Sequence, residues 1–497
     1  MMETLKRVSP EKAGIHSQSI MEFIRQAQAE GIELHSLMIL RHGKVCEEAW
    51  WKPYDSGTPQ TMFSFSKSIT STAVGFAVQE GLLSLDEKLV DLFPDETPEN
   101  PSENLKEADV YSLLTMSCGH ESDIYYKLKS YENWIYDFMH ADFKYKPGTM
   151  FQYNSTGTDM LCAIIKKKTG MNVSAYLKPR LFDKIGMTNI SCRLLPGDIE
   201  MGGSGFRVKT EDMARLGQFY LNRGVWNGEH LLNEEWIDMA TSRQISTVNP
   251  VFDNHDSNWQ HGYGFQFWRC IPDGLYRADG AYGQFAIMVP DKDVVIAITS
   301  ASFQPDRLLN IVWEKLLPGI TDQDELEESV SYEQLKYMNG ELAIPGLWNV
   351  RNKVHEDAWG GIRYKVSDEA VPCFADLTGG PGKWESYGRN LSALSFEFQR
   401  TECRIHIEDE DFTSDLYAGM DGTYHVSYVR GEKFAASACW EEENVFSLVV
   451  RALKTVSGTR FRITFGEKEI SVRRCPLMPQ IGEKFAEQDW EHLVLKA

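Results

Sequence analysis

The chain has 497 residues and a formal net charge of −21, with 51 lysines and arginines against 72 aspartates and glutamates. Such an excess of acid repels phosphate backbones and argues against nucleic-acid binding. Hydrophobic residues make up 42% and charged residues 25%, which excludes collagen-like and disordered chains. There is no apolar run long enough for a membrane span and no secretion signal at the N-terminus. We therefore expect a cytoplasmic protein of two or three domains, without a nucleic-acid or membrane partner.

The nine cysteines are dispersed, and no two of them have the Cys-x-x-Cys spacing of a redox or zinc site. An odd number of scattered cysteines is typical of reduced thiols in a cytoplasmic protein. The twelve histidines form neither a His-Glu-x-x-His motif nor a cluster with cysteine. The sequence thus predicts no catalytic metal and no cofactor.

The first 320 residues mix helix and strand patterns. Two short apolar runs around a turn at 41–44 predict a hairpin over 37–51. Apolar residues at helical spacing, each series followed by a glycine, predict helices over 64–81, 158–169 and 210–222. Residues 285–300 predict two strands around a Pro-Asp turn. These elements indicate a sheet with helices around it.

The pattern changes after residue 318, where Pro318-Gly319 is followed by an acidic, solvated stretch. We expect a linker or connecting helix over 321–345. Beyond it, seven short alternating runs separated by turn residues predict an antiparallel barrel or sandwich over 346–497. These runs are 361–366, 394–400, 403–408, 423–429, 445–453, 459–465 and 469–474.

Ser64 and Lys67 form a Ser-x-x-Lys motif at the start of a predicted helix. Residues three apart share one helix face, and a partly desolvated lysine has a lowered pKa and can accept a proton from the serine. The motif is weak by itself, because Ser9 and Lys12 repeat it. The alternative interpretation of Ser64 and Lys67 is a helix cap followed by a solvated lysine.

Tyr153 and Ser155 follow a Pro-Gly turn and a short strand, and they precede a predicted helix. A tyrosine beside a lysine can share a proton and pass it to a leaving group. Four other Tyr-x-Ser or Tyr-x-Asn pairs occur in the chain, but only this one has the strand–turn–helix setting. Simple packing of the aromatic ring is the alternative role for Tyr153.

Taken in order, these motifs resemble the serine β-lactamase and penicillin-binding-protein superfamily, in the branch of class C β-lactamases, D-aminopeptidases and bacterial esterases. The resemblance covers about residues 8–318 and includes Phe63-Ser64-Phe65-Ser66-Lys67-Ser68 and Tyr153-Asn154-Ser155. Further similar stretches are Glu80-Gly81-Leu82-Leu83-Ser84-Leu85-Asp86, Leu92-Phe93-Pro94, Leu113-Leu114-Thr115-Met116-Ser117-Cys118-Gly119-His120 and Gly202-Gly203-Ser204-Gly205. It implies an α+β fold, also described as an α/β sandwich. An antiparallel sheet is flanked by helices and accompanied by an all-helical region, over 1–320.

The third motif of this superfamily, Lys/His-x-Gly, falls at Ala278-Asp279-Gly280. Gly280 is retained, and it would let substrate lie flat along the strand. Alanine stands at the cationic position, so a substrate carboxylate has no partner there, which counts against β-lactamase and carboxypeptidase activity. Arg277 is one residue off and is expected to point to the other face of the strand from Ala278.

The resemblance implies acyl transfer on Ser64, with Lys67 and Tyr153 as general base and acid. It also implies that Ser155 orients Lys67 and that the N–H groups of Ser64 and Ala281 hold the oxyanion. Substrate-binding candidates are Gly280, Ala281, Ser155 and His120, and loop packing is the alternative for His120. No metal or cofactor is implied.

The sequence therefore predicts a serine hydrolase that cleaves a small ester, amide or peptide. A D-amino-acid peptidase, a weak β-lactamase and a non-catalytic binding or sensor protein remain as alternatives. The C-terminal strands resemble the lipocalin-like barrels appended to some members of this superfamily, and a homo-oligomer is left open.

Overall fold

The computed structural model describes residues 4–127, 132–248, 257–366, 371–378, 386–478 and 491–497, without the side chains of 491–493. The chain divides into two compact units. The first contains Met1–Ala49 and Thr61–Gly340, and the second contains Trp50–Gln60 and Glu341–Ala497. A short segment near the N-terminus thus belongs to the C-terminal unit, an excursion that nothing in the sequence pattern indicates.

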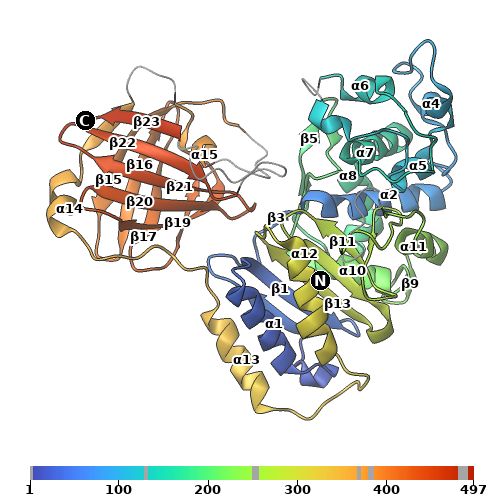
Figure 1. Ribbon diagram of the computed structural model, residues 1–497, viewed down its shortest axis with the longest axis horizontal. Helices are drawn as coiled ribbons and strands as arrows, with labels where there is room; N and C mark the ends of the chain where they lie inside the picture. The colour runs from blue at the N-terminus through green and yellow to red at the C-terminus, as the bar shows by residue number, and fades with distance from the viewer. Residues whose placement is uncertain (1–3, 128–131, 249–256, 367–370, 379–385, 479–490) are drawn as a thin grey trace. The chain divides into compact units, whose positions relative to one another are not determined.

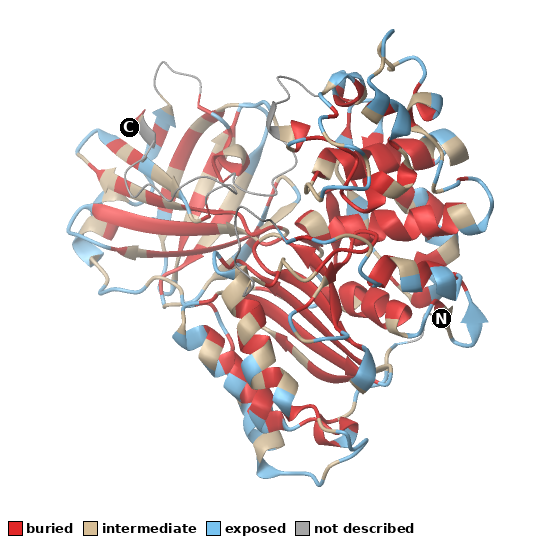
Figure 2. Cartoon of the chain, turned by 45° about the vertical axis from the view of Figure 1, so that its right-hand side comes forward, coloured by how far each residue is buried: buried red, intermediate tan, exposed pale blue. Residues whose placement is uncertain are grey.

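A six-stranded sheet forms the centre of the first unit, in the order β10-β11-β12-β13-β1-β2 (Figure 1). Every residue of β1, β12 and β13 is buried, as Figure 2 shows, because helices cover both faces of these central strands. The predicted hairpin and the predicted strand pair at 285–300 are both present. The strands are β1 (Leu34–Arg41), β2 (Lys44–Trp50), β10 (Trp268–Arg269), β11 (Tyr276–Gly280), β12 (Gln284–Val289) and β13 (Val294–Ser300).

One face of this sheet packs against α10 (Thr210–Leu221), which contacts β1, β12 and β13. The other layer joins α1 (Ser17–Ala29), α12 (Pro305–Ile311) and η6 (Val312–Leu316), which pack on one another (Figure 1). Amphipathic helices of this kind bury one apolar stripe and leave the other side in water. The result is the helix–sheet–helix arrangement that the resemblance implies.

A helical region lies beside the sheet, built around α2 (Ser66–Gln79) and α7 (Ser155–Thr169). Helix α2 is buried on nearly every side, so it is a central helix. The 3₁₀ turn η2 (Phe63–Phe65) leads into it. The other helices of the first unit are η1 (Glu11–Ala13), α3 (Leu89–Leu92), α4 (Glu103–Glu107), α5 (Val110–Leu114), η3 (Ile124–Lys127), α6 (Trp134–His140), α8 (Val173–Leu177), η4 (Lys178–Phe182), α9 (Asp183–Ile185), α11 (Glu234–Thr241), η5 (Pro290–Lys292), η7 (Leu317–Gly319) and α13 (Val330–Glu341).

Short strands complete the first unit in three small sheets. The order β3-β7-β4 places the strand before η2 beside residues that follow the Gly-rich turn at 202–205. The strands are β3 (Gln60–Thr61), β4 (Ser191–Cys192), β5 (Leu194–Leu195), β6 (Ile199–Glu200), β7 (Phe206–Val208), β8 (Val225–Trp226) and β9 (Glu229–His230).

The second unit is a β-barrel, coloured orange to red in Figure 1. Nine strands close into a ring through the parallel pair β17–β19, and β18 extends the sheet beyond it. The other ladders are antiparallel. The strands are β14 (Arg363–Val366), β15 (Leu391–Phe398), β16 (Glu402–Asp409), β17 (Thr413–Gly419), β18 (His425–Val429), β19 (Glu432–Trp440), β20 (Val445–Ala452), β21 (Gly458–Phe465), β22 (Glu469–Pro476) and β23 (Glu491–Lys496), with α14 (Lys353–Trp359) and α15 (Phe374–Leu377) between them.

Aromatic side chains fill the barrel core. Phe465 stacks on Trp359 and also meets Tyr364, Phe396 and Trp440. The segment before β3 joins this unit through Asp55, whose carboxylate bonds to Lys433 on β19. The expected fold class, a β-lactamase-like α+β domain followed by an antiparallel barrel, is confirmed.

Candidate active site

Ser64 lies in η2, at the point where the chain enters α2. The residue before it, Phe63, has φ 48°, a left-handed conformation that bulky residues rarely adopt. Strain of this kind persists only where the surrounding structure enforces it, and it is frequent at functional sites. The ring of Phe63 meets Tyr282 edge-on at 5.1 Å between centroids.

Lys67 lies one turn further, on α2, and is completely buried. Its Nζ is 3.0 Å from Ser64 Oγ, 3.1 Å from Ser155 Oγ and 2.6 Å from the carbonyl oxygen of Gly203. Two hydroxyls and one carbonyl therefore surround the amine, and its hydrogen-bond partners include no carboxylate. An ammonium so placed is poorly compensated for the water that it has lost.

Burial lowers the pKa of Lys67 from 10.5 to about 8, against the opposing fields of Asp123, Asp159 and Asp279. At neutral pH a usable fraction of the amine is then unprotonated, as a general base requires. The second Ser-x-x-Lys copy is different. Lys12 is half exposed and pairs with Glu325, while Ser9 Oγ accepts a bond from the Lys12 backbone N–H.

Tyr153 stands beside Lys67, whose Nζ lies 4.8 Å from the centroid of the tyrosine ring. The ring is fixed by an aromatic cluster: it stacks on Trp268 at 5.6 Å and meets Tyr263 edge-on at 6.4 Å. Phe151 packs against the same three rings. The sequence left two roles open for Tyr153, packing of its ring and action beside the Lys67 amine. The structure shows both the ring packing and the position beside the amine.

Ser155 begins α7, and Gly203 comes from the turn before β7. Two features fix the position of Gly203. Its N–H donates to Asp159 Oδ1 at 2.8 Å, and the surrounding atoms leave no room for a side chain. A Cβ at Gly203 would lie 2.7 Å from the Ser155 carbonyl oxygen. Glycine is therefore needed to bring this carbonyl to Lys67.

The third motif borders the site on β11. A Cβ at Gly280 would lie 2.1 Å from the carbonyl oxygen of Met62, so this glycine lets the strand approach the turn that carries Ser64. Packing of substrate along this strand, the role expected for Gly280, stays a prediction. Ala281 follows in the turn to β12, next to Tyr282, which has φ 63°. Two left-handed residues in ring contact, Phe63 and Tyr282, thus adjoin Ser64 and Ala281.

Arg277 and Asp279 lie on the other face of β11 from Ala278, as the alternation of a strand requires. They form a buried ion pair, with Nε 2.8 Å from Asp279 Oδ2, and Trp259 Nε1 donates to the same oxygen at 3.0 Å. Arg277 is therefore committed to a partner within its own strand. Ala278 leaves the family's cationic position without charge.

His120 does not join the group around Lys67. It is 2% exposed, its ring packs between Phe138 and Phe143, and its Nδ1 lies 3.0 Å from Asn154 Nδ2. Asn154 caps α7 by accepting the N–H of Gly157. The contacts of His120 thus favour support of the helix start, the alternative that the sequence left open.

Two further carboxylates lie near Lys67, and the sequence assigns neither of them a contact with it. Asp159 is buried on α7, and burial raises its pKa to about 7. Asp123 lies just before η3 and bonds to the first turn of α7. Neither residue has a spacing signal, because both act through contacts that exist only in the folded chain.

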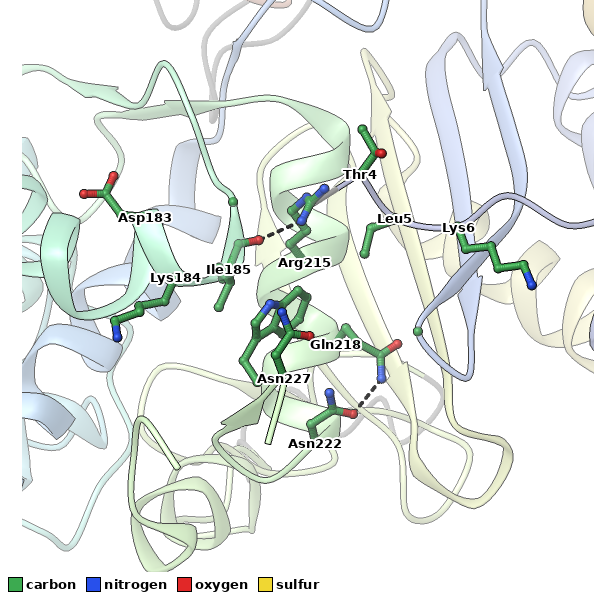
Figure 3. Close-up of a pocket in the computed structure, with 13 residues that line it drawn as sticks. Thr4, Leu5, Lys6, Asp183, Lys184, Ile185, Arg215, Gln218, Asn222 and Asn227 are labelled. Carbon is green, nitrogen blue, oxygen red and sulfur yellow. Dashed lines mark hydrogen bonds between the residues drawn. The ribbon is translucent and has the colours of Figure 1, made fainter. Parts of the chain in front are cut away.

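A separate pocket of about 430 Å³ lies along α10 (Figure 3). It shares no residue with the group around Ser64, and three of its charged side chains, Asp183, Lys184 and Arg215, are paired within the protein. Arg215 bonds to Glu211 and to the Ile185 carbonyl, as Figure 3 shows for the second contact. Within the described residues, no group of three or more histidine, cysteine or acidic side chains is arranged to hold a metal.

Comparison with known proteins gives one family. The family model described as Beta-lactamase matches residues 22–316. An uncharacterised protein of Alkalihalophilus pseudofirmus is 23% identical over 54% of this chain and 84% of its own length. The 6-aminohexanoate-dimer hydrolase of Paenarthrobacter ureafaciens is 22% identical over 57% of this chain and 76% of its own.

Among solved structures, the octameric penicillin-binding protein homologue from Pyrococcus abyssi superposes with a TM-score of 0.50 at 16% identity. The match covers 96% of this chain and 99% of that one. At this identity the likeness concerns the fold alone. Within the described residues, no helix is both long and apolar enough to span a membrane.

Proposed function

Because the chain belongs to the beta-lactamase family of hydrolases, we propose that it cleaves an ester or amide through an acyl-enzyme on Ser64. Lys67 and Tyr153 act as general base and acid. The observation that carries the proposal is the buried amine of Lys67, 3.0 Å from Ser64 Oγ and without a carboxylate partner. A solvated structural lysine would have neither property.

In the first step, Ser64 Oγ attacks the substrate carbonyl and its proton passes to Lys67 Nζ. The N–H groups of Ser64 and Ala281 receive the developing oxyanion, an arrangement supported by the ring contact between Phe63 and Tyr282. The bond to the leaving group then breaks, and Tyr153 protonates the departing oxygen or nitrogen. Lys67 returns a proton to Tyr153.

In the second step, water attacks the acyl carbonyl and gives up its proton to the Lys67 and Tyr153 pair. The ester bond to Ser64 breaks, and Ser64 Oγ recovers a proton. Ser155 keeps Lys67 in place throughout, through its 3.1 Å contact with Nζ. In the first step the Lys67 and Tyr153 pair delivers a proton to the leaving group, and in the second it accepts one from water. These proton transfers use side chains of the protein alone.

The substrate subsite beside β11 favours neutral substrates over carboxylate-bearing ones. Ala278 supplies no charge, and Arg277 is already paired with Asp279. Esters and amides without a neighbouring carboxylate should therefore be cleaved faster than β-lactams or carboxyl-terminal peptides. The name of the Paenarthrobacter relative makes an aminohexanoate amide a sensible member of the substrate panel.

The test compares Ser64→Ala, Lys67→Ala and Tyr153→Phe with the wild type on p-nitrophenyl esters, D-residue amides, the 6-aminohexanoate dimer and a chromogenic β-lactam. We expect near-complete loss of turnover in the first two variants and a large loss in the third. Ser9→Ala, in the second Ser-x-x-Lys copy, is the matched control and should retain full activity. Wild-type turnover in Ser64→Ala would end the proposal.

A non-catalytic binding or sensor role is the competing proposal. A serine-reactive phosphonate separates the two, because an activated Ser64 is phosphonylated and a merely structural serine is not. Failure of wild-type protein to react, with no turnover across the panel, would favour the sensor. The intact contacts among Ser64, Lys67 and Ser155 favour the enzyme.

The remaining proposals concern the chain as a whole. We propose a hydrolase domain over 1–320, a linker over 321–345 and a barrel domain over 346–497, in a cytoplasmic protein that assembles into a homo-oligomer. The barrel is proposed to take part in assembly or to shape access to the site. Light scattering and kinetics of the full chain and of a truncation ending near Gly319 test this, and a soluble truncation with the same oligomeric state and the same kinetics would contradict it.

A further inference from the structure

Asp123 makes four hydrogen bonds, three of them to the first turn of α7. Its carboxylate accepts the backbone N–H of Ser155 at 2.6 Å and of Thr156 at 3.4 Å, together with the Thr156 hydroxyl at 2.8 Å. The fourth comes from the backbone N–H of Tyr125 at 3.0 Å. The residue is 8% exposed, so these bonds form away from bulk water.

These bonds satisfy helix donors that otherwise lack partners. The first N–H groups of a helix have no acceptor within the helix, and α7 has its N-cap at Asn154. The Asn154 side chain takes the N–H of Gly157, and Asp123 takes those of Ser155 and Thr156. A negative charge at a helix start is also favourable in the helix field.

A continuous path of contacts links this carboxylate to the proposed base. Asp123 holds the backbone N–H of Ser155, Ser155 Oγ lies 3.1 Å from Lys67 Nζ, and Nζ lies 3.0 Å from Ser64 Oγ. Because Ser155 is the first residue of α7, a shift of this turn displaces its hydroxyl directly. The loop that carries Asp123 is thereby coupled to the amine.

We propose that Asp123 is a positioning residue, whose carboxylate fixes the first turn of α7 so that Ser155 holds the Lys67 amine against Ser64. The inference rests on the proposed function, because it assigns a task within that catalytic group. Asp123 touches neither Ser64 nor Lys67 through a hydrogen bond, and it acts through Ser155.

The charge of Asp123 gives this role a separate signature. Three carboxylates act on the charge of Lys67: Asp123 in the loop before η3, Asp159 on α7 and Asp279 on β11. Asp279 is also paired with Arg277 on the same strand. All three carboxylates favour the protonated amine, and Asp123 is the strongest of them. Removing its charge should therefore lower the pKa of Lys67 and move the acid limb of the pH–rate profile to lower pH.

The test measures kcat, KM and the pH profile of kcat/KM for Asp123→Asn and Asp123→Ala in the full chain, on the best ester of the panel. We expect Asp123→Ala to lose kcat on the order of 10²-fold, the usual cost of a displacement of about 1 Å, with a smaller change in KM. Asp123→Asn keeps one of the two acceptor oxygens, so it should lose less kcat than Asp123→Ala and still shift the limb.

Asp109→Asn is the matched control. Asp109 is also a capping carboxylate: it accepts the backbone N–H of Ser112 at 3.0 Å at the start of α5 and pairs with Lys88. This variant should lose stability while it retains the wild-type kcat and acid limb. Wild-type kcat in Asp123→Ala, or an unmoved limb in Asp123→Asn, would overturn the inference.

Folding and function are kept apart in this design. If Asp123→Ala does not fold, Asp123→Asn decides through the position of its acid limb. Ser64→Ala is assayed in parallel, and its activity reports on the proposed function alone. Loss of activity in Ser64→Ala together with wild-type behaviour of both Asp123 variants would remove the inference and leave the function standing.

Discussion

Replacing Lys67 with methionine should change how the stability of the chain depends on pH. Methionine has a similar length and no charge, and Lys67 is completely buried. The pKa of Lys67 falls from 10.5 to about 8 on folding because burial disfavours the ammonium. Between these two values the unfolded chain binds the proton more tightly than the folded chain, so wild-type stability rises with pH through this window.

The size of the effect follows from the shift. One pKa unit corresponds to about 1.4 kcal/mol, so the contribution of Lys67 amounts to about 3 kcal/mol across the window. Below about pH 8 the wild type carries the full cost of a buried ammonium, and near pH 10.5 that cost has largely gone. Lys67→Met has no such cost at either pH.

The measurement is urea unfolding of wild type and Lys67→Met at about pH 7 and about pH 10.5. Titrating groups remote from Lys67 affect both proteins equally. Asp159, whose pKa of about 7 is held down by the Lys67 charge, has a higher pKa in the variant and moves the difference in the same direction. The stability of the wild type relative to the variant should increase by about 3 kcal/mol on going to high pH. Parallel pH dependence of the two proteins would refute a depressed pKa and, with it, the neutral amine.

Other positions give independent tests. Gly280→Ala should lose activity and about 1–3 kcal/mol of stability, because its Cβ would lie 2.1 Å from the Met62 carbonyl oxygen. Gly340→Ala is the control: open space surrounds this position in α13, so the variant should be neutral or stabilising in thermal unfolding. Tyr282→Ala should lower kcat more than it raises KM in steady-state kinetics, since it removes the ring contact with Phe63, whereas the exposed Tyr428→Ala should change neither. Phe465→Ala should destabilise the barrel by about 3–5 kcal/mol in chemical denaturation, and an unchanged unfolding midpoint would contradict the packed aromatic core.

The sequence predicts the central elements of the first unit well because their patterns are strong. The strands on both sides of the Pro290 turn are apolar except at the ends far from the turn, and α2 combines a helix pattern with a glycine just after its end. Helix α7 begins three residues before the predicted start, at Ser155. Asn154 and Asp123 cap that start, and the second of these lies 32 residues away in the chain.

Three barrel strands are absent from the predicted set, each for a local reason. Strand β19 contains Ala435, Ala436 and Ala438, which have low strand propensity, and Ala436 and Ala438 pack into the barrel core. Strand β17 begins with Thr413-Ser414-Asp415, which has the composition of a turn. Strand β23 follows a long stretch without clear alternation.

In the candidate site, too, the sequence predicts some residues and misses the contacts of others. Ser64, Lys67, Tyr153 and Ser155 have motif spacing and converge in the structure. Asp159 has no signal in the sequence. Gly203 lies in one of the stretches that resemble the superfamily, but the contact of its carbonyl with Lys67 becomes visible only in the folded chain. Their positions depend on how the turn before β7 packs on α7.

The most direct test of the account is to trap the acyl-enzyme. Wild-type protein is mixed with a slowly hydrolysed p-nitrophenyl ester, quenched in acid and measured by intact-protein mass spectrometry, with peptide mapping of the label. We expect one acyl group per chain on Ser64, and none in Ser64→Ala or Lys67→Ala. Rapid ester hydrolysis with the label on another residue, or with equal labelling in Ser64→Ala, would contradict the account.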